Sequence, residues 1–277
     1  MSDVLSQELK IKLEKIISIF KNQNVIIAFS GGVDSSLLAF LSRRFAHKTL
    51  LITENSILYP NEEIEEAKKF AKKYDIPHLI IDRDPLANEN FRCNPEERCY
   101  ICKTGLYESI LKIKLEKDFD LVIDGSNYND LSDYRPGMKA LKELDICTPY
   151  IKYEINKEEI RELSRYYGLK VQSKPSMACF SSRIPYGQEI NVEKLNRISD
   201  GESFLKKTFK LKQLRVRHHD NKLARIEFLP EDLPKILTND NIALIKVKFK
   251  ELGFAYITID IEGFRSGSMN EVLDLNS

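Results

Sequence analysis

Short apolar runs alternate with segments whose apolar residues recur at helical spacing. The apolar runs predict buried strands at residues 24–28, 49–53, 77–84 and 120–127. The helical spacings predict amphipathic helices at residues 5–20, 34–41, 61–76, 103–115 and 156–169. Strands that alternate with helices in this way predict an α/β fold built on a parallel sheet.

The pattern changes near residues 183–187. Beyond this point it predicts a helix at residues 192–207, a hairpin at 213–228 with a turn near 219–221, a helix at 240–252 and a strand at 255–261. This order is typical of a small α+β domain. We therefore divide the chain into a first domain at residues 1–185 and a second domain at residues 186–277.

The composition narrows the classes of function. The 277 residues carry a formal net charge of +1, which argues against a protein that binds nucleic acid through its overall charge. No apolar run approaches the ~20 residues of a membrane span, and the N-terminus lacks a signal-peptide pattern. Five cysteines without a secretion signal favour reduced thiols or metal ligands. We therefore expect a cytoplasmic protein without a membrane partner.

Residues 24–36, NVIIAFSGGVDSS, carry the strongest chemical signal. They predict a strand, a tight turn and a helix N-terminus in that order. Gly31 and Gly32 allow a sharp turn and close approach of backbone N–H groups to a ligand, and a helix N-terminus attracts anions. Asp34 is placed to hold Mg²⁺ against such an anion. The alternative is an ordinary turn that binds no ligand. That alternative does not account for Asp34, Ser35 and Ser36 directly after the glycine turn.

Polar segments also follow two other predicted strands, at residues 53–56 and 124–127. Ligands of open parallel sheets bind at the carboxyl ends of the strands, so we expect these segments to meet the glycine turn in one crevice. A triphosphate with Mg²⁺ suits this crevice. The predicted ATP-binding residues are Ala28, Ser30, Gly31, Gly32, Asp34, Ser35, Ser36, Ser56 and Gly125.

The cysteines give a second signal. Cys99 and Cys102 form a CxxC pair, which we expect in a loop, and which brings two sulfur atoms close enough to bind one metal ion or cluster. Cys93 and Cys179 could complete a zinc site with this pair, whereas three cysteines could hold an iron-sulfur cluster with one open iron. Cys179 alone suits a nucleophile or sulfur carrier, and a structural thiol is the plainer alternative. Cys147 has an apolar setting and is expected in the core.

Basic residues in the second domain give a third signal. Arg215 and Arg217 alternate along a predicted strand and therefore share one face. Clustered arginines suit phosphate or carboxylate, although solvated strand charges are the alternative. Glu202 and Glu227 could bind a cation in the same domain. The predicted substrate-binding and phosphate-binding residues are Arg183, Arg215, Arg217 and Arg265.

The segment SGGVDS resembles the PP-loop signature of ATP pyrophosphatases, which cleave ATP between the α and β phosphates. Together with DGSNYNDLSDYRPG, ACFSSRIPYG, RVRHHDNKLARIE and DIEGFRSGSMN, it resembles the LarE family of ATP-dependent sulfur transferases over nearly the whole chain. The resemblance implies that ATP adenylates the carboxylates of pyridinium-3,5-biscarboxylic acid mononucleotide. Sulfur then displaces AMP and leaves thiocarboxylates, in the biosynthesis of a nickel-pincer nucleotide cofactor.

The resemblance also implies a source of sulfur. In one branch of the family, the cysteine that matches Cys179 gives up its own sulfur, and those members lack the CxxC pair. Cys99 and Cys102 are similar to the other branch, in which they and Cys179 would hold a [4Fe-4S] cluster whose open iron carries sulfide. Cys93 would then be a spare thiol. The implied partners are a small nucleotide substrate, sulfide or a sulfur donor, and further copies of the chain in a homo-oligomer.

Two other functions stay open at this point. A tRNA thiolation enzyme of the PP-loop superfamily also combines this loop with cysteines. The near-neutral charge and the small second domain argue against the extended basic surface that tRNA binding needs. A non-catalytic zinc and nucleotide-binding module is the other alternative, and it would release no pyrophosphate from ATP.

Overall fold

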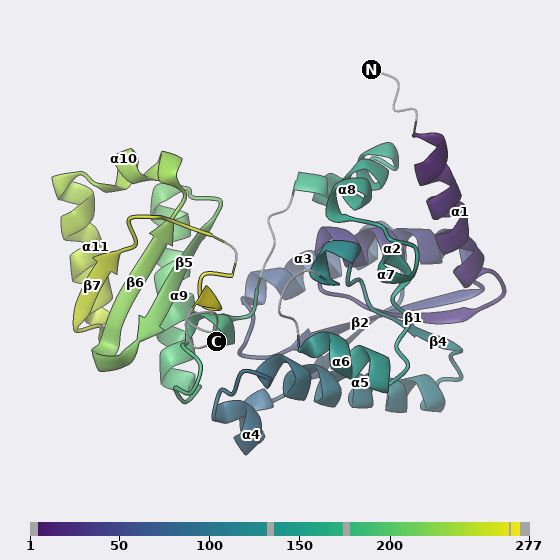
Figure 1. Ribbon diagram of the computed structural model, residues 1–277, viewed down its shortest axis with the longest axis horizontal. Coiled ribbons are helices and arrows are strands. Elements are labelled where there is room, and N and C mark those ends of the chain that lie inside the picture. The colour runs from purple at the N-terminus through teal and green to yellow at the C-terminus, as the bar shows by residue number, and fades with distance from the viewer. Residues whose placement is uncertain (1–4, 132–135, 174–177, 266, 272–277) are drawn as a thin grey trace. The chain divides into compact units, whose positions relative to one another are not determined.

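The computed structural model describes residues 5–131, 136–173, 178–265 and 267–271. The chain forms two compact units that interleave along the sequence (Figure 1). Unit 1 comprises Met1–Ser56, Pro60–Asp84 and Glu97–Ser176, and unit 2 comprises Ile57–Tyr59, Pro85–Glu96 and Met177–Ser277. These units divide the chain at positions other than residue 185. The two domains that the sequence predicts, with a boundary after residue 185, stay a prediction.

Unit 1 is built on a parallel sheet, whose described strands lie in the order β3-β2-β1-β4. The strands are β1 (Asn24–Ala28), β2 (Lys48–Asn55), β3 (His78–Asp82) and β4 (Leu121–Ile123). Ile26 of β1 pairs with Leu50 of β2 on one side and with Val122 of β4 on the other. Central strands of a parallel sheet are buried on both faces and therefore have apolar sequences. The predicted α/β fold with a parallel sheet is confirmed.

Helices cover both faces of this sheet (Figure 1). The helices of unit 1 are α1 (Gln7–Phe20), α2 (Val33–Phe45), α3 (Asn61–Lys73), α5 (Arg98–Glu116), α6 (Gly137–Glu143), α7 (Pro149–Lys152) and α8 (Lys157–Tyr166), with 3-10 turns η2 (Tyr128–Leu131) and η3 (Lys170–Ser173). Val25 and Ile27 of β1 belong to the core under α1, α2, α3 and α8, whereas Ile26 belongs to the core under α5 and α6. This alternation follows from the two-residue period of a strand.

Helix α5 begins earlier than the pattern predicts. It starts at Arg98, so Cys99 and Cys102 lie within its first five residues, and the expectation that they lie in a loop is wrong. The first turn buries the side chain of Arg98 instead of an apolar residue, so hydrophobic spacing gives no signal there. Residues three apart are neighbours on a helix surface, which places both cysteines on one side of α5.

Unit 2 contains a mixed sheet, whose described strands lie in the order β5-β6-β7. The strands are β5 (Leu214–His219), β6 (Leu223–Phe228) and β7 (Tyr256–Ile259). The predicted hairpin is confirmed, because β5 and β6 pair antiparallel with Arg217 opposite Arg225. Strand β7 then pairs in parallel with β6.

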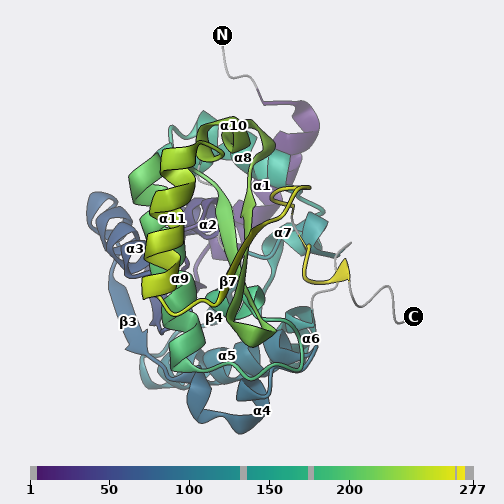
Figure 2. The ribbon, with the colours of Figure 1, turned by 90° about the vertical axis from the view of Figure 1, so that its left-hand side faces the viewer.

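Helices α9 and α11 cover one face of this sheet (Figure 2). The helices of unit 2 are α4 (Glu89–Arg92), α9 (Val192–Phe209), α10 (Leu233–Ile236) and α11 (Asn239–Glu251), with 3-10 turns η1 (Pro85–Ala87), η4 (Phe180–Arg183), η5 (Asp220–Lys222) and η6 (Pro230–Asp232). Leu205 of α9, Val216 of β5 and Phe249 of α11 are buried in one core. No helix in the described part of either unit is long and apolar enough to cross a membrane.

Candidate functional site

The PP-loop connects β1 to α2 and has the geometry of an anion site. Gly31 has a φ of +69°, a left-handed conformation that other residues rarely adopt. The Ser30 hydroxyl accepts the Gly32 N–H at 3.3 Å and lies 3.2 Å from the Ser35 hydroxyl. Gly32 is the N-cap of α2 and has no side chain to cap it, and the N–H groups in the first turn of a helix attract anions. Ser36 is fully buried, and its hydroxyl has no hydrogen-bond partner among the described residues.

Asp34 lies in the first turn of α2 beside this loop. One of its carboxylate oxygens, Oδ2, forms an ion pair with Nζ of Lys157 at the start of α8. The other oxygen, Oδ1, is buried and has no hydrogen-bond partner in the described part of the chain. Burial raises the pKa of Asp34, although the Lys157 ammonium opposes this shift. A buried carboxylate oxygen without a donor fits a ligand of Mg²⁺.

The end of β4 approaches the PP-loop at Gly125. A Cβ atom at this position would lie 3.1 Å from the backbone nitrogen of Ser35 and 3.4 Å from Cβ of Asp34. Any larger residue would therefore push against the start of α2. The structure brings Gly125 together with Asp34 and Ser35.

Asp124 is buried at the end of β4 and surrounded by donors. Its Oδ2 accepts the hydroxyl of Tyr107 and lies 3.3 Å from Nζ of Lys103, and its Oδ1 accepts the Ser126 N–H at 2.7 Å. Burial alone would raise the pKa of Asp124, but the Lys103 ammonium and these hydrogen bonds hold it below its ordinary value. Lys103 directly follows the CxxC pair, so α5 is connected to this strand end.

Ser56 is buried just beyond β2 and hydrogen-bonds to Glu54. The Glu54 carboxylate accepts Nη1 of Arg83 at 2.9 Å. Burial raises the pKa of Glu54, and Arg83 opposes the shift. Ala28, the last residue of β1, pairs with Ile52 of β2, so the PP-loop and Ser56 leave the sheet at the same edge. The strand ends therefore converge, while the ATP contacts of the single residues stay predictions.

Three of the cysteines lie in unit 1. Cys99 is exposed and Cys102 is half-buried on α5. Cys147 is half-buried, packs against the core as the sequence predicts, and has a pKa raised by burial. No group of three or more His, Cys, Asp or Glu side chains in the described ranges is placed to hold a metal ion.

The other two cysteines lie in unit 2. Cys93 is exposed directly after α4. Cys179 is half-buried before η4, with its Sγ 2.9 Å from the Ser181 hydroxyl. The loop that the sequence predicts before Cys179 includes residues 174–177, which lie outside the described residues.

Arg183 is fully buried and holds the backbone around Cys179. Its Nη1 donates to the carbonyl oxygens of Ala178 and Cys179 at 2.8 and 2.9 Å, and its Nε donates to Oε1 of Glu202 at 2.9 Å. Burial would raise the pKa of Glu202, but the Arg183 guanidinium holds it below its ordinary value. This geometry favours a positioning role for Arg183. Its contact with a substrate phosphate stays a prediction.

Arg217 forms a buried ion pair with Glu227. Its Nε and Nη2 donate to the two oxygens of Glu227 at 3.0 and 2.7 Å, and its Nη1 donates to the Ser182 carbonyl at 3.0 Å. The Ser268 hydroxyl donates to Glu227 at 2.7 Å. The network therefore connects the hairpin to the segment that follows Cys179.

Arg215 is buried in the same unit. Its guanidinium lies 5.0 Å from the centroid of the Phe264 ring and donates to the Leu214 carbonyl at 2.8 Å. Burial, together with the charge of Arg183, lowers the pKa of Arg215 to about 10. The described part of unit 2 buries more guanidinium groups than carboxylates: Arg183, Arg215 and Arg217 against Glu202 and Glu227. Such an excess of buried positive charge suits a bound anion.

Arg265 is more exposed than the other arginines of the predicted set. It donates to both carboxylate oxygens of Glu271 at 2.6 and 2.8 Å, and to Asp260 at 3.3 Å. These hydrogen bonds raise the pKa of Arg265. Asp260 also accepts Arg225 of β6 at 2.7 Å, a pairing that the sequence analysis did not find because only the fold brings the two residues together.

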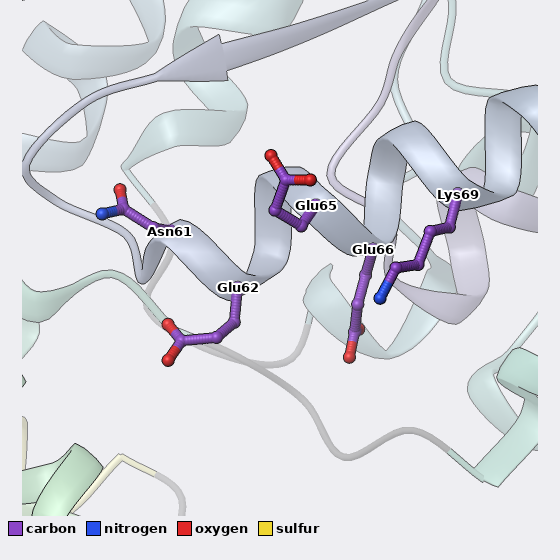
Figure 3. Close-up of a pocket in the computed structure, with 5 residues that line it drawn as sticks. All are labelled: Asn61, Glu62, Glu65, Glu66 and Lys69. Carbon is purple, nitrogen blue, oxygen red and sulfur yellow. The ribbon is translucent and has the colours of Figure 1, made fainter.

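A separate pocket of ≈ 370 Å³ lies on α3. It is lined by Asn61, Glu62, Glu65, Glu66 and Lys69 (Figure 3). Its lining is mainly acidic, and Glu65 pairs with Lys68 at 2.7 Å. An acidic lining repels a polyphosphate, so this pocket does not compete with the PP-loop as the nucleotide site.

Comparison with known proteins extends these observations. Residues 5–100 match the family model described as NAD synthase. An uncharacterized protein of Synechocystis sp. is 39% identical over 96% of this chain and 99% of its own length. The pyridinium-3,5-bisthiocarboxylic acid mononucleotide synthase of Lactiplantibacillus plantarum is 30% identical over 91% of this chain and 90% of its own length. The tRNA-specific 2-thiouridylase MnmA of Aquifex aeolicus is 25% identical over 54% of each chain.

The parallel sheet, the glycine turn at its carboxyl edge and the NAD synthase match define a PP-loop enzyme that uses ATP. The similarity to the L. plantarum synthase extends beyond this PP-loop region into unit 2. The chain belongs to the LarE family and is an ATP-dependent sulfurtransferase.

Proposed function

We propose that this chain converts the carboxylates of pyridinium-3,5-biscarboxylic acid mononucleotide into thiocarboxylates. The similarity to the L. plantarum synthase over nearly the whole chain carries this proposal. A substrate carboxylate oxygen attacks the α phosphorus of ATP, the bond to the β-phosphate oxygen breaks, and pyrophosphate leaves with the bonding electrons. Sulfur then attacks the activated carbonyl carbon and AMP leaves. Adenylation is needed because AMP is a far better leaving group than the oxide of a free carboxylate.

In this proposal unit 1 binds Mg²⁺-ATP through the PP-loop and Asp34. The N–H groups at the start of α2 hold phosphate oxygens, and the buried Oδ1 of Asp34 is the cation ligand. Unit 2 binds the phosphate of the substrate mononucleotide. The excess of buried arginines over glutamates supports this role, and Arg215 and Arg265 are the residues that we assign to it.

We assign Cys99, Cys102 and Cys179 as the ligands of a [4Fe-4S] cluster. The position of Cys99 and Cys102 on one side of α5, near its start, supports two of the three ligands. When bound, the cluster would supply sulfide for the transfer. Arg183 fixes the backbone of Cys179 and so holds the third sulfur in place. Cys93 has no assigned role, and the homo-oligomer, the sulfur donor and the cytoplasmic location stay predictions.

Acceptor-dependent release of pyrophosphate tests the substrate. We expect release from Mg²⁺-ATP to require pyridinium-3,5-biscarboxylic acid mononucleotide and to be unaffected by unmodified tRNA. Copurifying tRNA, or release that depends on tRNA, would instead favour the thiouridylase function that the partial similarity to the A. aeolicus enzyme raises.

Iron content after anaerobic reconstitution tests the cluster. Cys99→Ala and Cys102→Ala should each lose most of the iron and all multiple turnover, since two thiolates hold a cuboidal cluster poorly. Cys147→Ala is the matched control, because this cysteine packs in the core, and it should keep both. Stoichiometric zinc without a cluster in the unmodified protein would overturn the assignment.

A further inference from the structure

We propose that His78 and Thr53 are positioning residues for the PP-loop. His78 donates to the Thr53 hydroxyl, Thr53 donates to the Phe29 carbonyl, and this chain of hydrogen bonds sets the peptide from which the loop departs. All three residues belong to unit 1. The proposal rests on the ATP-dependent activity and not on the identity of the sulfur acceptor.

The protein backbone leaves the sheet at Phe29, between the last residue of β1 and the PP-loop. Pairing of β1 with β2 ends at Ala28, which lies opposite Ile52. The Phe29 N–H still donates to the Ile52 carbonyl at 2.8 Å, and the Phe29 carbonyl accepts the Thr53 hydroxyl at 2.7 Å. A side chain of β2 therefore holds the carbonyl at the point where the pairing of the two strands ends.

The hydrogen-bond roles in this chain follow from the groups themselves. A carbonyl oxygen only accepts, so the Thr53 hydroxyl donates its proton to Phe29. Oγ1 of Thr53 also lies 2.7 Å from Nε2 of His78, where it has to accept, so Nε2 carries a proton. Burial lowers the pKa of His78, and the Lys68 ammonium lowers it further. The imidazole is therefore neutral at pH 7, with its proton on Nε2.

Aromatic packing and burial fix the same point. The Phe29 ring lies 5.9 Å from the His78 ring and 5.2 Å from the Phe70 ring, measured between centroids. Phe29 is 2% exposed and Thr53 is 6% exposed. A buried carbonyl that loses its donor is destabilising, so loss of the Thr53 hydroxyl would favour a rotation of the peptide that follows Phe29.

This peptide carries the effect into the loop. A peptide bond is planar and trans, so the Ser30 N–H points opposite to the Phe29 carbonyl, away from Thr53. The Ser30 hydroxyl accepts the N–H of Gly32, the N-cap of α2, at 3.3 Å, so the path reaches the anion site. Groups that bind the reacting phosphates have to be preorganised, because a misplacement of about 1 Å can reduce the rate by about 10²-fold.

Thr53→Val and Thr53→Ser test the proposal, because valine removes the hydroxyl at nearly constant volume and serine keeps it. In Thr53→Val, Mg²⁺-pyrophosphate should bind about tenfold more weakly by calorimetry, the effect of one hydrogen bond to a charged group. Thr53→Ser should stay within about threefold of the unmodified protein. The matched control is Thr49→Val, near the other end of β2. Thr49 is also 6% exposed, its hydroxyl pairs with Ser42 at 2.8 Å, and pyrophosphate binding should not change.

His78→Phe tests the first link of the chain. Phenylalanine keeps a ring beside Phe29 and removes the donor to Thr53, so pyrophosphate should bind about threefold more weakly or worse. Unchanged affinity in this variant or in Thr53→Val would overturn the proposal. Equal losses in Thr53→Val, Thr53→Ser and Thr49→Val would overturn it too, since they would mark a general loss of stability.

Imidazole NMR of ¹⁵N-labelled protein tests the chain in the unmodified protein. The sequence has four histidines, and the signals that disappear in His78→Gln belong to His78. We expect a neutral ring with its proton on Nε2, and a shift of this signal when Mg²⁺-pyrophosphate binds. A proton on Nδ1 alone, or a signal that pyrophosphate leaves in place, would contradict the proposal. If the pyridinium nucleotide proves to be the wrong acceptor, these experiments still decide the role of His78 and Thr53, because none of them uses an acceptor.

Discussion

Replacing Arg217 with Ala should destabilise unit 2 through the partner that it leaves behind. Glu227 is fully buried and accepts two hydrogen bonds from Arg217, at 3.0 and 2.7 Å. Removal of one member of a buried ion pair typically costs about 3–5 kcal/mol, because the remaining charge is uncompensated. Ser268 at 2.7 Å and Arg225 at 3.3 Å would still contact Glu227. We therefore expect the lower end of that range, about 3 kcal/mol.

The assay is urea unfolding followed by circular dichroism, since the chain has no tryptophan. The double variant Arg217→Ala/Glu227→Gln removes both charges and should recover about 1–2 kcal/mol of the loss. ATP affinity should not change in either variant, because the PP-loop belongs to unit 1. A loss below about 1 kcal/mol for Arg217→Ala would refute the reasoning, since an exposed pair costs that little. A double variant no more stable than the single one would refute it too.

Three further outcomes follow from the geometry. Gly125→Ala should weaken ATP binding by about tenfold, as measured by calorimetry. The Cβ of the new alanine would lie 3.1 Å from the backbone nitrogen of Ser35 and would shift the start of α2. An unchanged Kd for ATP would contradict this. Arg215→Met should weaken binding of the substrate nucleotide by about tenfold and leave ATP affinity unchanged; equal substrate affinity would leave Arg215 a structural residue. Burial lowers the pKa of His218 from 6.5 to about 4, so the unfolded state takes up a proton first as the pH falls. The unfolding free energy should therefore decrease between pH 6.5 and 4, and His218→Phe should decrease less over this range; identical pH slopes would contradict the assignment.

The sheet of unit 1 could be predicted because its central strands are buried on both faces. Val25, Ile26 and Ile27 are fully buried, so an apolar run marks the strand in the sequence. The start of α5 could not be predicted in the same way, because its first turn buries Arg98 and shows no apolar spacing. The interleaving of the two units also leaves no mark in local composition, since it depends on contacts between distant segments.

The nucleotide site was easier to predict from the sequence than the surroundings of the buried arginines of unit 2. The left-handed turn at Gly31 and the close approach at Gly125 both favour glycine, so the two glycines in the sequence are consistent with this geometry. The sequence predicts Arg183 and Arg217 as ligand-binding residues, and this stays a prediction; the fold adds that they pair with the buried Glu202 and Glu227. Only tertiary contacts decide whether a buried arginine pairs with an Asp or Glu side chain of the same chain, so the sequence does not reveal it. The ion pair between Lys157 and Asp34 was missed for the same reason, although a lysine at the first position of a helix is an unusual choice that could have drawn attention.

The most direct test of the account is mass spectrometry of the nucleotide product. Anaerobically reconstituted protein is incubated with Mg²⁺-ATP, sulfide and pyridinium-3,5-biscarboxylic acid mononucleotide, and the product is counted per chain while the intact mass of the protein is followed. We predict one sulfur in place of one oxygen at each carboxylate, more than one product per chain, and no change in protein mass. A protein lighter by one H2S, with at most one sulfur transferred per chain, would contradict the cluster as the source of sulfur. A nucleotide that gains no sulfur would contradict the central claim itself.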